Sequence, residues 1–145
     1  MKEIYDVGII FRGFILVNNI FKELPKQKEM DSQKDLRGAF ISAITTFTES
    51  IFNNNYLEYL ESGDILFLFK MAEIKSSDSN IKEPLILYCL TRKTIKNPDK
   101  VVKKFREKAE LILQAFIMKY NNYNFTEIFH FENFKDELNR YFIKK

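Results

Sequence analysis

The order of the apolar segments constrains the fold of this chain more than any other feature. Two short strand-like runs come first, followed by one helical pattern, three more strand-like runs and two helical patterns. Together these segments occupy all 145 residues. We therefore expect a single α+β domain spanning residues 1–145, with no separate catalytic domain.

The strand-like runs predict a five-stranded, largely antiparallel sheet, because short links join most neighbours. Their predicted bounds are Ile4–Phe11, Phe14–Phe21, Tyr56–Leu60, Ile65–Ile74 and Leu85–Leu90. The segments ILFLF (Ile65–Phe69) and LILYCL (Leu85–Leu90) are apolar without alternation, which is typical of strands covered on both faces. These two strands should therefore be interior, with helices on both sides of the sheet.

The first helical pattern should begin near Asp31 or Ser32, either of which can cap it, and end at Asn53–Asn55. Its apolar stripe includes Ile44 and Phe47 at helical spacing. Because one helix cannot cover two faces, we expect this helix on one face and the two C-terminal helices on the other.

Asn97 and Pro98 mark the start of the second helix, and the third should lie within Glu127–Ile143. The second pattern is apolar on two sides. One stripe would face the sheet, whereas Leu111, Ala115 and Met118 lie roughly opposite it. We expect the third helix to cover that opposite stripe.

Composition and motifs favour no enzymatic chemistry. The net charge of +3 is too small to indicate nucleic-acid binding. His130 is the only histidine and has no metal ligands at suitable spacing, while Cys89 lies in an apolar strand, where a thiol is usually a small buried hydrophobe. We expect no catalytic residue, cofactor or metal.

The lone cysteine also suits a reducing compartment, and no apolar run is long enough to span a bilayer. We therefore expect a cytoplasmic protein. Basic residues gather at Lys100–Lys108, diluted by Glu107. This run is most simply a solvated helix face, with contact to a membrane surface as the alternative.

The segment Tyr56–Leu60 is short, aromatic and expected at a sheet edge, where unpaired backbone groups invite another chain. Small residues on the first helix would let a partner approach closely. The predicted partner-binding residues are Arg37, Gly38, Ala39, Ser42, Tyr56 and Tyr59. Simple core packing of the tyrosines is an equally weighted interpretation.

The order of elements resembles the longin-like group and its roadblock relatives. YDVGIIFRGFILVNNIF is similar to the opening longin hairpin, and DLRGAFISAITTFTESIF followed by YLEYLESGDILFLFK is similar to the helix-to-meander segment. The resemblance covers essentially the whole chain but carries no invariant motif. It implies a non-enzymatic platform for a protein partner, such as a small GTPase or a second longin or roadblock subunit, including a homodimer.

A ligand-binding sensor of the PAS or profilin-like class is the alternative function. Such a sensor should hold an internal apolar cavity with a few convergent polar groups, whereas a scaffold should have a filled core and an exposed apolar patch.

Overall fold

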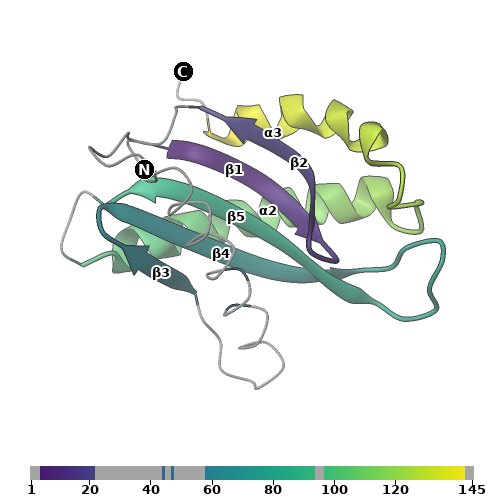
Figure 1. Cartoon of the computed structure of the whole chain (residues 1–145), viewed down its shortest axis with the longest axis horizontal. Coiled ribbons are helices and arrows are strands. Elements are labelled where there is room, and N and C mark those ends of the chain that lie inside the picture. Colours follow the sequence, from purple (N-terminus) through teal and green to yellow (C-terminus); the bar gives the residue numbers. More distant parts are fainter. Residues whose placement is uncertain (1–3, 22–43, 45–46, 48–57, 94–96, 143–145) are drawn as a thin grey trace, which may run out of the picture.

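The computed structural model describes residues 4–21, 44, 47, 58–93 and 97–142, and they form an α+β fold (Figure 1). Five antiparallel strands lie in the order β2-β1-β5-β4-β3. The elements are β1 (Ile4–Phe11), β2 (Phe14–Ile20), β3 (Tyr59–Ser62), β4 (Ile65–Ile74), β5 (Glu83–Arg92), α2 (Asp99–Tyr120), the 3-10 helix η1 (Ile128–Asn133) and α3 (Phe134–Phe142). The predicted fold class is confirmed, and β4 and β5 are interior as expected.

Turn residues fix the two tight hairpins. Arg12 and Gly13 both have positive φ, 52° and 81°, in the two-residue turn between β1 and β2. Gly63 has a φ of 58° at the start of the turn between β3 and β4. Left-handed backbone of this kind matches the twist of paired strands, which is why the hairpins close in two residues.

The β3 strand differs from its predicted bounds. Tyr59 and Leu60 belong to it, but the strand continues to Ser62 and does not include Glu58. Tyr56 lies outside the described residues. Ser62 pairs with Ile65 across the two-residue turn, and this turn fixes the register of β3 on β4. The strand therefore continues up to the turn at Ser62.

Alternation along the interior strands divides the core between the two faces of the sheet. Leu66 and Leu68 belong to a cluster with the buried residues of α2, η1 and α3. Phe67 and Phe69 belong to a second cluster. Both faces of β4 are therefore buried, as the unbroken apolar run predicted.

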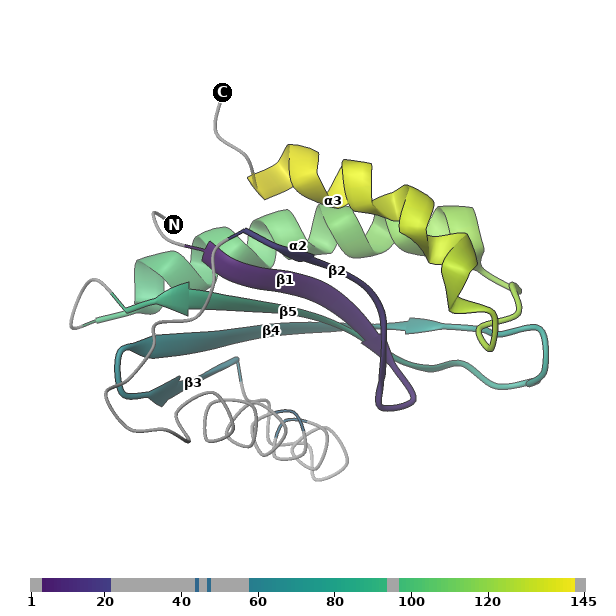
Figure 2. The ribbon, with the colours of Figure 1, turned by 45° about the horizontal axis from the view of Figure 1, so that its top comes forward.

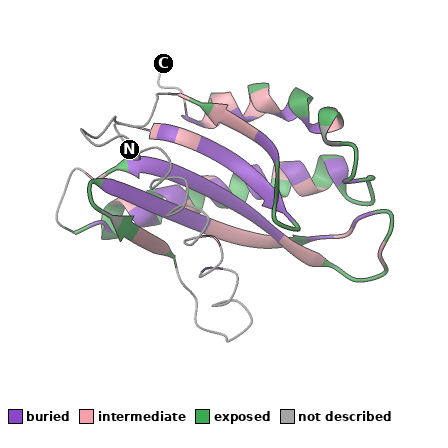
Figure 3. Cartoon of the chain, viewed as in Figure 1, coloured by how far each residue is buried: buried purple, intermediate pink, exposed green. Residues whose placement is uncertain are grey.

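The α2 and α3 helices lie side by side on one face of the sheet (Figure 2). The prediction that the third helix covers the outer stripe of the second was wrong. Leu111 is 60% exposed and Met118 86% exposed, because α3 packs next to α2 on the sheet instead of over it (Figure 3). Ala115 is only partly buried.

On the opposite face, the described residues of the first predicted helix are Ile44 and Phe47, and both are helical. Phe47 is buried and stacks on Phe69, with ring centroids 4.8 Å apart. The rest of that helix lies outside the described residues, as do its predicted ends.

A small polar group lies on this same face, with Tyr88 buried and Asp6 and Asn18 half-buried. The Tyr88 hydroxyl donates to Asp6 Oδ1 at 3.1 Å, and Asn18 Nδ2 donates to the same oxygen at 3.3 Å. Burial raises the pKa of the Asp6 carboxyl, although both hydrogen bonds act against the shift. Gly8 lies under the Tyr88 ring, where it leaves room for the ring to cross β1.

Arg12 ties the β1–β2 turn to the loop between β4 and β5. Its Nε donates to Glu83 Oε1 at 2.9 Å and its Nη2 to Asp78 Oδ1 at 2.9 Å. The guanidinium also lies 4.9 Å from the centroid of the Phe11 ring. Hydrogen bonds from Arg12 hold the pKa of Asp78 well below its usual range.

Among the helices that the structure describes, none is long and apolar enough to cross a bilayer.

Candidate functional site: the free edge of β3

The β3 strand is one of the two edges of the sheet, and its hydrogen-bond phase determines which backbone groups point outward. The Phe69 N–H donates to the Glu58 carbonyl at 3.1 Å. Antiparallel pairing alternates, so Leu60 also exchanges hydrogen bonds with β4, whereas Tyr59 and Glu61 direct their N–H and C=O groups away from the sheet. In the described part of the chain no strand pairs with these groups.

The side chains of β3 fix its orientation over the core. The Tyr59 ring is half-buried against the cluster that α2 and α3 cover, and Leu60 packs against the opposite cluster. Glu61 Oε2 forms an ion pair with Lys93 Nζ at 2.8 Å. The strand is thus anchored by its side chains while its outer backbone stays open.

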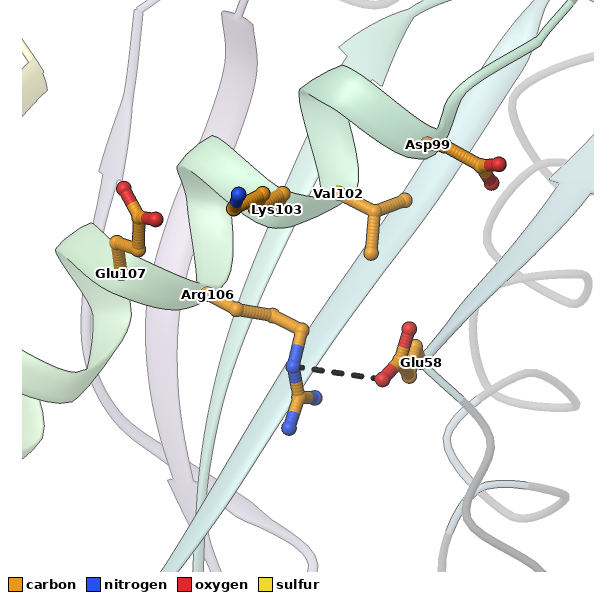
Figure 4. Close-up of a pocket in the computed structure, with 6 residues that line it drawn as sticks. All are labelled: Glu58, Asp99, Val102, Lys103, Arg106 and Glu107. Carbon is orange, nitrogen blue, oxygen red and sulfur yellow. Dashed lines mark ion pairs between the residues drawn. The ribbon is translucent and has the colours of Figure 1, made fainter.

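A surface pocket of about 320 Å³ adjoins the start of this strand, between it and the first turns of α2 (Figure 4). Val102 is its apolar component, and every other lining residue is charged. The lining residues are Glu58, Asp99, Val102, Lys103, Arg106 and Glu107. Arg106 extends from α2 toward Glu58, with Nε 3.5 Å from Oε1 (Figure 4).

Three carboxylates and two cations therefore line one small depression. Asp99 is in the first turn of α2, where the helix dipole favours negative charge, and its N–H donates to Asn97 Oδ1 at 3.1 Å. Asn97 and Pro98 lie at the start of α2 as expected, but Pro98 is the N-cap residue and the Asn97 side chain accepts from one position before it. Mixed charges of this kind select partners by complementarity and hold them in register.

Neither His130 nor Cys89 lines this pocket. The described residues hold no group of three or more His, Cys, Asp or Glu side chains placed to bind a metal. His130 Nε2 lies 2.8 Å from Glu127 Oε2 on the surface of the protein. Cys89 is fully buried, and burial raises the pKa of its thiol, which keeps it protonated and unreactive.

The predicted partner-binding residues are described only in part. Arg37, Gly38, Ala39, Ser42 and Tyr56 lie outside the described residues. Tyr59 is placed at the edge strand, as expected, but its ring packs inward. The substitution Tyr59→Asp would therefore put a charge against the core and test folding more than binding.

Sequence reasoning missed the contribution of α2 to this edge. The basic run at Lys100–Lys108 is not uniform, because Arg106 pairs with Glu58 and Lys108 Nζ lies 5.1 Å from the Phe142 ring centroid. The only signal in the sequence is the helical spacing of Asp99, Lys103 and Arg106, which places them on one side of the helix.

Comparisons with protein-family models, curated proteins and solved structures gave no match.

Proposed function

We propose that this chain is a non-enzymatic protein-interaction module, resembling the longin-like regulators and scaffolds of small GTPases and membrane-trafficking complexes. One observation carries the proposal: the free edge of β3 presents the backbone of Tyr59 and Glu61 beside the charged pocket of α2. A partner segment that adds to this edge gains main-chain hydrogen bonds, while the pocket discriminates between partner side chains.

The arrangement of elements supports the family part of the proposal. The resemblance rests on an opening hairpin, a helix after a loop, a three-strand meander and C-terminal helices. The structure contains a β1–β2 hairpin, the consecutive neighbours β3, β4 and β5, and the α2–α3 pair. The proposed partner is a small GTPase or a second longin or roadblock subunit, with a homodimer as the self-association form.

The sensor alternative receives less support. A ligand site needs polar groups that are available to the ligand. The polar side chains of Asp6, Asn18 and Tyr88 bond to one another. This arrangement favours a structural role for them.

Capture of purified small GTPases, each loaded with GDP or with a non-hydrolysable GTP analogue, tests the proposal. Arg106→Glu would replace the ion pair with Glu58 by a fourth carboxylate in the pocket and should abolish capture. Lys119→Glu is the matched control, because Lys119 is also on α2 and also has one long ion pair, 3.8 Å from Glu137. Circular dichroism would verify that both variants are folded.

Equal capture by the two variants would show that the β3 edge is not the docking surface. If neither nucleotide state of any GTPase is captured, light scattering measures whether the protein forms the homodimer that the self-association form of the proposal requires. In that case the wild type should be dimeric and Arg106→Glu monomeric, and a monomeric wild type would overturn the proposal.

A further inference from the structure

The second edge of the sheet, β2, also has an open backbone. The Phe21 N–H donates to the Tyr5 carbonyl at 2.9 Å, in register with the pairing of Val7 with Asn19. Alternation then directs the N–H and C=O groups of Asn18 and Ile20 outward. No strand of the described chain pairs with them.

The composition of β2 is unusual for an edge. Natural edge strands are commonly protected by charged side chains, proline or very short length. The segment FILVNNI contains no charged residue and no proline, and it is seven residues long. Phe14 is 71% exposed, Ile20 64% and Ile15 40%. The β3 edge differs, because it has four residues and is flanked by the charges of Glu58, Glu61 and Arg106.

We infer that the free edge of β2 binds an extended, apolar segment of a protein partner, which adds to the sheet as a sixth strand. Only an extended chain can satisfy the outward groups of Asn18 and Ile20 together. Apolar side chains on that segment would cover Ile15 and Ile20, which are otherwise in water. No residue of β2 itself is charged, so the strand offers an acidic or basic segment no ion pair of its own.

The position of α3 favours a lone segment over a second copy of this chain. α3 lies directly above β2, with Asn19 Nδ2 donating to Asn139 Oδ1 and the Phe21 and Phe142 rings 6.5 Å apart (Figure 2). Two copies paired through β2 would place their strands about 4.8 Å apart, with both α3 helices on the same face. Packed helix axes need about 8–10 Å, so the two helices would collide. A single added strand has no helix of its own at that position.

A labelled synthetic peptide of alternating valine and threonine, with lysine at each end for solubility, is a suitable probe. Fluorescence anisotropy should show saturable binding to the wild-type protein. Ile20→Lys should weaken binding by about 10-fold or more, since a lysine on the edge opposes strand addition. Ile81→Lys is the matched control, because Ile81 is 69% exposed in the loop between β4 and β5 and should leave binding unchanged.

Amide hydrogen exchange identifies the edge that is used. Bound peptide should slow exchange at Asn18 and Ile20, while Tyr59 and Glu61 should be unaffected. Protection at Tyr59 and Glu61 instead would overturn the inference for β2 and support the proposed function at β3.

Other outcomes are equally decisive. Absence of saturable binding, or equal binding by Ile20→Lys and Ile81→Lys, would refute the inference. A wild-type dimer that Ile20→Lys converts to monomer would show that the occupant is a second copy. None of the results that would refute the inference at β2 would contradict the proposed function at β3.

Discussion

Gly8 is the position where the structure makes its sharpest prediction about stability. A Cβ atom at this position would lie 2.5 Å from Tyr88 Cε2, 2.6 Å from its hydroxyl oxygen and 2.7 Å from Cζ. Real Cβ contacts are never this short, so Gly8→Ala must displace the Tyr88 ring or separate β1 from β5.

Either response is costly. Tyr88 has no exposed surface, and overpacking a core typically costs about 1–3 kcal/mol. Moving the ring also breaks the hydrogen bond to Asp6, and a bond to a charged group contributes about 1.5–3 kcal/mol. We therefore expect Gly8→Ala to lower the free energy of unfolding by about 2–5 kcal/mol.

Urea denaturation of a double-mutant cycle would test this explanation. In a Tyr88→Leu background the ring is gone, so Gly8→Ala should be neutral or should stabilise by about 0.4–1 kcal/mol through the unfolded state. A loss of the same size in both backgrounds would refute the steric argument, as would a neutral Gly8→Ala in the wild type.

Three further predictions concern the core and the titratable groups. Phe47→Ala should destabilise the fold by about 3–5 kcal/mol, because Phe47 is buried. Lys104→Ala, at an exposed position, should change the free energy of unfolding by less than about 0.5 kcal/mol. Similar losses for the two variants in chemical denaturation would contradict the helix face assigned to Phe47. Burial raises the pKa of Asp6 above 3.8, so the folded state binds this proton more tightly and stability falls as the pH rises through the raised pKa. In urea melts over a pH series, Asp6→Asn should remove this fall in the free energy of unfolding. A pH profile that is the same for Asp6→Asn and the wild type would contradict the role given to Asp6. Arg12 lowers the pKa of Asp78, so the stability that Asp78 contributes is present above pH 3.8 and is lost as the pH falls toward the lowered value. The difference in free energy of unfolding between the wild type and Asp78→Asn should therefore shrink in acid. A difference that stays constant with pH would count against a stabilising ion pair between Arg12 and Asp78.

Local signals predicted the strands well. The bounds of β1 and β4 are those expected, because the turn residues Arg12–Gly13 end β1 and the turn at Gly63 precedes the start of β4. Continuous apolar runs also identified the interior strands. These features depend on neighbours in sequence, and a single sequence contains them.

Features that depend on how distant elements pack together were harder to predict from the sequence. Leu111 and Met118 repeat at helical spacing as a buried stripe does, yet they are exposed because α3 is adjacent to α2 and not above it. The pocket joins Glu58 to Arg106, which are far apart in the chain, and only the docking of α2 beside β3 brings them together. Helical periodicity shows that a stripe exists but not which element covers it.

The strand order also has a consequence for synthesis on the ribosome. β1 is an interior strand, but one of its two neighbours is β5, so the pairing of Gly8 with Tyr88 cannot form until Tyr88 has been made. At the usual elongation rates of about 5–20 residues per second, translating the roughly 80 intervening residues takes on the order of 4–16 s. During this interval the nascent β1–β2 hairpin has two open edges, neither closed by a partner strand. The time needed to translate as far as Arg92 therefore sets the window in which neighbouring nascent chains can pair wrongly through this hairpin.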